Sequence, residues 1–224
     1  MGAEARTFDR NARGVREVLA MKYDTFPFEG DWKAAFGTPE RTGTWLIWGN
    51  TGSGKTMFAM MLAKELCKYG RVAYNSLEEG ASMSIRDKMV RAGMMEVNKR
   101  FLLLEGEDMD QLKLRLKRQK SPDFVIIDSF QYCGLNYPAY RKFKSEHRNK
   151  LLIFVSHADG TYPNGRGARG VMYDASMKIY VEGKRAFCKG RSIGDKGTFD
   201  VWPEYAATYW ADRETPRSDY LLNK

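Results

Sequence analysis

The residues best suited to chemistry lie in one short segment, which reads Gly49-Asn50-Thr51-Gly52-Ser53-Gly54-Lys55-Thr56. Its glycines allow the backbone to curl so that several N–H groups point inward, where they can bind phosphate oxygens. Lys55 adds a compact positive charge for the outer phosphates, and Thr56 offers a hydroxyl ligand to Mg²⁺. The pattern G-x-x-x-x-G-K-T therefore predicts a loop that binds a nucleoside triphosphate, ATP, together with Mg²⁺.

The segments on either side of this loop are of the kind that position it. Residues 44–48 form an apolar run that is typical of a buried strand. Residues 57–69 have a helical pattern that stops at Gly70. The positive end of the helix dipole would then face the phosphates.

Three polar residues are expected at the ends of later strands. Asp128 ends an apolar run, so it should reach the Mg²⁺ shell beside Thr56 at the carboxyl edge of a parallel sheet. Glu78 follows another strand and is the favoured general base for orienting a water, with its neighbour Glu79 as the alternative. His157 closes a third strand, where it could sense the γ-phosphate.

The alternation of strands and helices predicts an α/β fold, with a mostly parallel central sheet flanked by helices. The expected strands before residue 160 are 44–48, 71–76, 101–104, 124–128 and 151–155. A helix is expected over 82–92. Residues 108–119 are ambiguous, because the leucines alternate as in a strand while acidic residues precede basic ones as in a helix; we favour the helix.

The pattern changes after about residue 176. Residues 177–182, 185–189 and 198–202 resemble short strands joined by Gly-rich turns, which predicts an antiparallel C-terminal extension. We therefore divide the chain into an N-terminal extension (1–27, with a helical patch near 12–21), an ATPase core (28–202) and a polar C-terminal tail (203–224).

Residues 158–170 are rich in Gly and Arg and contain little apolar content. Such a segment is expected to be a mobile loop. Its position directly after His157 suggests that Arg166 and Arg169 contact the backbone of single-stranded DNA. The other histidine, His147, lies in a charged stretch and is expected at the surface.

The composition is that of a globular protein, with 224 residues, 43% of them hydrophobic and 29% charged. No apolar run is long enough to span a membrane, and the N-terminus has no signal-peptide core. Cys67, Cys133 and Cys188 are far apart, which favours reduced thiols in a cytoplasmic protein over a zinc site. The formal charge of +9 is compatible with a polyanionic partner.

These motifs together resemble the RecA-like ATPase family over roughly residues 28–202, especially the motor domain of DnaB-type replicative helicases and RadA-like recombinases. The more specific features are Ser76-Leu77-Glu78, Ile127-Asp128-Ser129-Phe130-Gln131, and Lys189-Gly190-Arg191 before a Gly-containing hairpin. DnaB-type proteins usually carry Gln at the place of His157. Neither the helicase N-terminal domain nor the RadA zinc module is recognisable, so we expect a core-only protein, like those of phages and mobile elements.

The resemblance implies that Lys189 and Arg191 act in trans, entering the nucleotide site of a neighbouring subunit as a lysine and an arginine finger. The chain would then form a ring or filament with ATP between subunits, and would act on single-stranded DNA in replication or recombination. Three alternatives stay open: a single-strand annealing protein with slight ATP turnover, a KaiC-like signalling ATPase and, least favoured, a small-molecule phosphotransferase.

Overall fold

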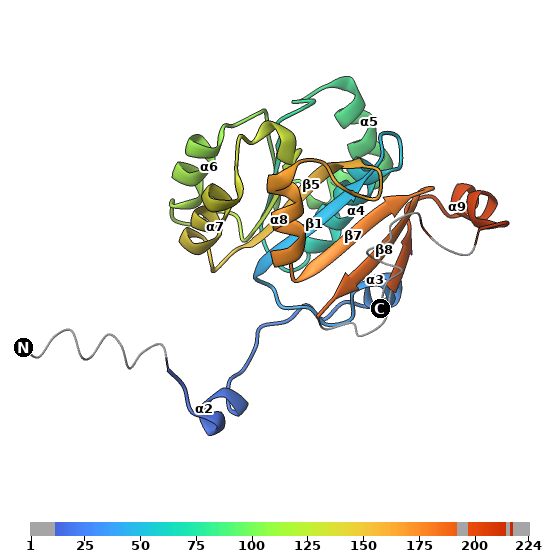
Figure 1. The fold of residues 1–224 in the computed structure, drawn as a ribbon. Coiled ribbons are helices and arrows are strands. Elements are labelled where there is room, and N and C mark those ends of the chain that lie inside the picture. The colour runs from blue at the N-terminus through green and yellow to red at the C-terminus, as the bar shows by residue number, and fades with distance from the viewer. Residues whose placement is uncertain (1–11, 192–196, 214–215, 217–224) are drawn as a thin grey trace, which may run out of the picture.

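The computed structural model describes residues 12–191, 197–213 and 216. These residues form one nine-stranded sheet, with the order β3-β2-β4-β5-β1-β7-β8-β9 and with β6 paired to β5 (Figure 1). The strands are β1 (Gly43–Gly49), β2 (Val72–Ser76), β3 (Phe101–Leu104), β4 (Phe124–Asp128), β5 (Leu151–Asp159), β6 (Tyr162–Pro163), β7 (Met177–Glu182), β8 (Arg185–Gly190) and β9 (Gly197–Asp200).

The strands from β3 to β7 in this order are parallel, and β8 and β9 extend the sheet in antiparallel fashion. The predicted sheet and its antiparallel extension are thus confirmed. The register pairs Gly49 with His157 and Ser76 with Asp128. The strand ends singled out in the sequence therefore lie along one edge of the sheet.

Helices cover both faces of the sheet, because side chains alternate along each central strand. Trp45 and Ile47 belong to one hydrophobic core, whereas Leu46 and Trp48 belong to the other. The first core is covered by α3 (Gly30–Phe36), α4 (Lys55–Leu66) and α5 (Met83–Ala92); the second by α6 (Met109–Leu116), α7 (Tyr137–Glu146), α8 (Arg166–Asp174) and α9 (Pro203–Trp210) (Figure 1). The remaining helical segments are α2 (Val15–Leu19), η2 (Met94–Val97) and η3 (Phe130–Tyr132).

The helix expected near residues 108–119 is present as α6. Its first turn is closed by a capping box, in which Asp108 accepts from the Gln111 N–H and the Gln111 side chain accepts from the Asp108 N–H. Leu112 and Leu116 are buried on one side of this helix, whereas Leu114 is exposed. The cap and the four-residue spacing explain why the alternating leucines do not form a strand.

The expected mobile loop over residues 158–170 is wrong. The segment continues β5, turns into β6 and then enters α8. Three apolar residues explain the helix, since Ala168, Val171 and Met172 are buried on one face while Arg166 and Arg169 point to solvent. Arg169 also pairs with Asp159 at 3.3 Å.

The expectation that His147 lies at the surface is also wrong. The residue is 3% exposed, its Nδ1 lies 2.9 Å from the Phe143 carbonyl oxygen, and its ring packs against that of Phe143. It is the C-cap residue of α7.

Two terminal segments pack more closely than a polar extension and tail would. Phe26, within the N-terminal segment, is buried and stacks on Phe28. Ala206 and Trp210 of α9 are buried, and the Tyr209 hydroxyl donates to Glu182 at 3.0 Å. All three cysteines are buried and free. Within the described residues, no helix has the length and apolar character needed to cross a bilayer.

Candidate functional site

The predicted phosphate loop connects β1 to α4, as expected, with α4 beginning at Lys55. Gly52 and Gly54 have φ values of 75° and 112°, which non-glycine residues rarely adopt. Gly49 passes so close to the neighbouring strand that a Cβ would lie 2.2 Å from the Val181 carbonyl oxygen. Glycine is thus needed at Gly52 and Gly54 for a left-handed backbone, and at Gly49 for the close approach of the chain to β7.

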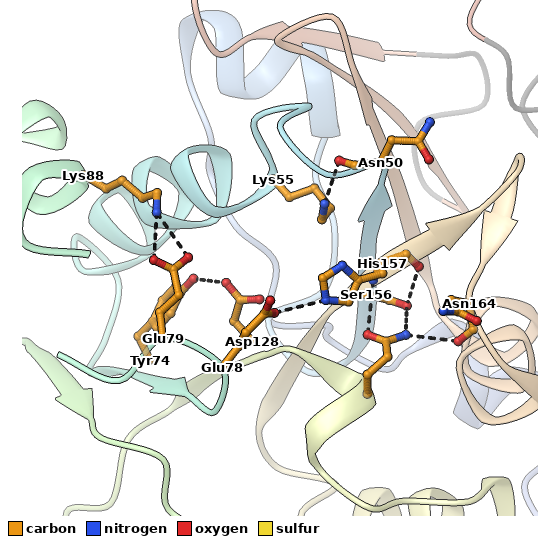
Figure 2. A network of polar contacts seen from close by, with 11 residues as sticks. Asn50, Lys55, Tyr74, Glu78, Glu79, Lys88, Asp128, Ser156, His157 and Asn164 are labelled. Carbon is orange, nitrogen blue, oxygen red and sulfur yellow. Dashed lines mark hydrogen bonds and ion pairs between the residues drawn. The ribbon is translucent and has the colours of Figure 1, made fainter. Parts of the chain in front are cut away.

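Lys55 reaches back across the loop, where its Nζ donates to the Asn50 carbonyl oxygen at 2.9 Å (Figure 2). Burial lowers the pKa of Lys55, an effect that the carboxylates of Asp128 and Glu78 oppose and that the charge of Lys184 reinforces. An anionic group bound in the loop would favour the charged ammonium.

Asp128 is 8% exposed at the end of β4 and accepts a hydrogen bond from the hydroxyl of Tyr74 on the neighbouring strand β2. Burial raises the pKa of Asp128, although the Tyr74 hydrogen bond opposes the shift. The next residue, Ser129, has a buried hydroxyl that makes no hydrogen bond to the described part of the chain. A buried carboxylate beside an unsatisfied hydroxyl suits a cation or its water ligands.

The two candidate glutamates differ in their contacts. Glu78 Oε2 lies 3.1 Å from His157 Nε2, whereas Glu79 pairs with Lys88 of α5 at 3.2 Å (Figure 2). Glu78 therefore belongs to the polar group at the strand ends, while Glu79 is held toward a helix. This difference favours Glu78 over Glu79 as the residue that faces a reacting water.

Gln131, which the sequence marks only as part of the motif over residues 127–131, connects two of these strand ends. Its Nε2 donates to the hydroxyl of Ser156 at 2.9 Å, and its Oε1 accepts from the His157 N–H at 3.2 Å. The same Nε2 lies 3.1 Å from the carbonyl oxygen of Asn164, just before α8. Gln131 thus links the site to α8 through hydrogen bonds.

A cavity of about 680 Å³ brings these residues together. Its walls include Lys55, Thr56, Glu78, Asp128 and His157, which are predicted site residues, and Lys184 and Trp202, which were not predicted. The Lys184 Nζ donates to the Gly52 carbonyl oxygen at 2.5 Å. The backbone N–H of Lys184 donates to the Ser53 carbonyl oxygen. The turn between β7 and β8 therefore lies against the phosphate loop of the same chain.

Lys189 and Arg191 lie at the other end of the sheet. Gly190, between them, pairs with Met177 at the start of β7, and the Arg191 N–H donates to the Ser176 carbonyl oxygen. Arg191 lines a second cavity of about 690 Å³, which we call the basic cleft; its cationic lining residues are Arg141, Lys144, Arg148, Lys150 and Arg191. The structure therefore does not bring the Lys-x-Arg pair to the phosphate loop of its own chain.

The residues present fit a Mg²⁺–ATP site in their chemistry. Among the described residues there is no cluster of three or more His, Cys, Asp or Glu side chains that could hold a metal. Mg²⁺ bound to a nucleotide is held by one or two protein oxygens together with phosphates and water. Thr56 and Asp128, both at the cavity, are suitable ligands of this kind.

Comparisons with known proteins agree with this architecture. No family model matches the chain. It is 34% identical over 86 residues to the DNA repair protein RadA of Streptococcus pneumoniae, a match that covers 38% of this chain and 20% of that protein. The match to RadA of Streptococcus pyogenes has the same identity and covers 18% of the relative, so the chain spans about a fifth of these curated relatives.

Two solved structures resemble the fold. The flagellar accessory protein FlaH of Methanocaldococcus jannaschii has a TM-score of 0.54 and 15% identity, with 76% of this chain and 88% of that chain covered. A KaiC-like protein of Pyrococcus horikoshii has a TM-score of 0.51 and 17% identity, with 78% and 90% covered. With the phosphate loop, these likenesses define this chain as having the RecA-like P-loop ATPase fold, which confirms the predicted fold and resemblance.

Proposed function

We propose that this protein binds ATP with Mg²⁺ at residues 49–56 and hydrolyses it. The observation that supports this function is the convergence of Lys55, Asp128 and the Glu78–His157 pair on one cavity. Backbone N–H groups of the loop and the N-terminus of α4 would bind the phosphates, and Lys55 would neutralise the outer ones.

The remaining roles follow from position. Thr56 and Asp128 would hold Mg²⁺, which supplies charge neutralisation at the phosphates when bound. Glu78 would orient the attacking water and accept its proton. His157, hydrogen-bonded to Glu78, would report the state of the γ-phosphate to Gln131 and α8.

We propose further that the active form is a ring or filament, in which Lys189 and Arg191 of a second copy complete the site. Their position at the opposite end of the sheet supports this assignment, because a residue acting in trans is not needed beside its own nucleotide. An arginine finger stabilises charge on the transferring phosphoryl group only when the subunits meet, which makes hydrolysis depend on assembly.

We propose single-stranded DNA as the partner, and a cytoplasmic protein acting in replication or recombination. The similarity to a DNA repair protein, the charge of +9 and the solvent-facing Arg166 and Arg169 support DNA binding. Two rival functions of the same fold make different predictions for ATP turnover. An ATP-switched annealing protein should show little turnover. A KaiC-like signalling ATPase should show turnover that DNA does not stimulate.

The test of catalysis uses the neighbouring glutamates as a matched pair. Glu78→Gln should retain ATP binding but lower kcat by about 10²–10⁴-fold, because an amide cannot accept the proton. Glu79→Gln should affect only the contacts of Glu79 with Lys88 and Ser82 and keep most of the activity. Steady-state phosphate release and ATP binding of both variants measure this.

If Glu79→Gln instead loses turnover while Glu78→Gln keeps it, the assignment of the base is wrong by one residue. If the purified wild-type protein neither binds nor hydrolyses ATP, with and without single-stranded DNA, the proposed function is wrong.

A further inference from the structure

A row of exposed tyrosines and arginines lies across α7 and α8, which pack side by side on one face of the sheet (Figure 1). We call it the α7–α8 face and define it by Tyr137, Arg141, Arg166, Arg169 and Tyr173. The tyrosine side chains are far from buried, since Tyr137 is 37% exposed and Tyr173 is 67% exposed.

Tyr137 is exposed but firmly held. Its ring lies against the backbone of α8 at Gly170, where a Cβ would be 2.5 Å from the ring. The ring also stacks on that of Tyr140, with the two centroids 5.9 Å apart. Tyr140 and Lys144 both donate to the carboxylate of Asp174, which joins α7 to α8. The Tyr137 ring and the junction of the two helices are therefore preorganised.

The arginines lie beside these rings on the same side of the helix. Arg166, Arg169 and Tyr173 follow one another at spacings of three and four residues, which places them on one face of α8. Arg169 is paired with Asp159, whereas neither Arg141 nor Arg166 forms an ion pair with another described residue. The acidic Asp174 is already paired with Lys144. The row thus carries net positive charge.

We propose that the α7–α8 face binds single-stranded DNA by stacking bases on Tyr137 and Tyr173, while the flanking arginines contact the phosphates. The inference rests on the proposed DNA partner and adds base contacts to it. Exposed aromatic rings beside cationic side chains are the two components of sequence-tolerant single-strand binding, since every base has a π-face. The Gln131–Asn164 hydrogen bond connects this face to the nucleotide site.

The experiment compares two probes of equal length, a thymidine oligonucleotide and an abasic oligonucleotide, which share phosphates but differ in bases. The full chain should bind the thymidine probe more tightly than the abasic probe. Tyr173→Ala should lower affinity for the thymidine probe by about 5- to 150-fold. It should leave affinity for the abasic probe unchanged, and Tyr173→Phe should retain the wild-type preference.

The arginines should behave differently from the tyrosines. Replacing Arg166 and Arg169 by Ala should weaken binding of both probes and flatten the slope of log affinity against log salt by about 0.7 per lost contact. The tyrosine variants should keep the wild-type slope. Because Tyr137→Ala also removes packing on α8, Tyr173→Ala is the decisive variant, and thermal unfolding checks that it is folded.

Three results would overturn the inference. Equal binding of the two probes by the wild-type chain, or Tyr173→Ala with unchanged thymidine affinity, would exclude base stacking here while leaving phosphate contacts and the proposed function intact. Failure of the wild-type chain to bind either probe would overturn the DNA partner itself.

Discussion

Lys55 is the residue on which nucleotide binding depends most directly. Burial lowers its pKa, and a bound phosphate would compensate for that burial with a charge-assisted hydrogen bond. Removing such a bond costs about 1.5–3 kcal/mol, so Lys55→Ala should weaken ATP binding by about 10- to 150-fold. Calorimetric titration with Mg²⁺–ATP measures the change.

A matched control lies on the same helix. Lys64 of α4 pairs with Glu96 at 3.0 Å and lies away from the loop. Lys64→Ala should bind ATP like the wild-type protein. Equal ATP affinity for wild type and Lys55→Ala would contradict the assignment of the loop.

For single residues, the sequence predicts a role correctly when that role depends on the neighbouring residues along the chain. The phosphate loop, Asp128 and Glu78 each lie at or just after the end of a strand, so a local pattern is enough to place them at the cavity. Lys184 could not be found in this way, because its contact with Gly52 depends on how a distant hairpin folds against the loop.

Among the secondary-structure elements, α7 and α8 are joined by hydrogen bonds to Asp174 as well as by apolar packing. Its carboxylate accepts from Tyr140 and Lys144, so Asp174→Asn leaves a lysine and a hydroxyl without their anionic partner. The free energy of unfolding should fall by about 1–3 kcal/mol near neutral pH. Urea denaturation of the two proteins tests this.

The effect should depend on pH in a defined direction. Burial acts to raise the pKa of Asp174, but hydrogen bonds from Lys144 and Tyr140 outweigh it and lower the pKa below its ordinary value of 3.8. The stabilisation is complete above that value and is lost as the pH falls through the lower folded pKa. The difference between wild type and Asp174→Asn should therefore shrink in acid.

Asp110 supplies the control for this measurement. A hydrogen bond from Lys113 lowers its pKa in the same direction, but the pair lies on the exposed side of α6. Asp110→Asn should leave the unfolding midpoint nearly unchanged. A loss as large as that of Asp174→Asn would show that the charge change, and not the junction of α7 and α8, sets the stability.

The elements differ in how well their sequences predict them. Strands β1, β4 and β5 are predictable because each contains a continuous apolar run buried on both faces. Helix α8 was missed because its arginines and glycines precede Val171 and Met172, so the apolar half of its pattern falls beyond the apparent loop. Helix α3 was not predicted because it is only seven residues long, begins with Gly30 and is followed by Gly37.

On the scale of the whole molecule, the phosphate loop and Arg191 lie at opposite ends of the sheet. If Arg191 acts in trans, Arg191→Ala should keep ATP binding but lower assembled turnover by about 10³–10⁵-fold. Mixing Arg191→Ala with Lys55→Ala subunits should restore part of the activity, because some interfaces pair an intact loop with an intact finger. Phosphate release across mixing ratios measures the rescue.

Sedimentation of the same mixtures shows whether the two variants assemble together. Co-assembled mixtures that stay inactive at every ratio would make Arg191 a cis or structural residue of the basic cleft. The order of the strands could not be predicted from local patterns, because it depends on pairing between segments far apart in the chain.

The central claim is that the chain is an ATPase whose site is completed by assembly on single-stranded DNA. The most direct measurement is the rate of ATP hydrolysis per subunit over a wide range of protein concentration, with and without a thymidine oligonucleotide, beside Lys55→Ala as the blank. We expect the rate per subunit to rise with protein concentration and to rise further with DNA. A rate that is independent of both, or that never exceeds the Lys55→Ala blank, would contradict the account.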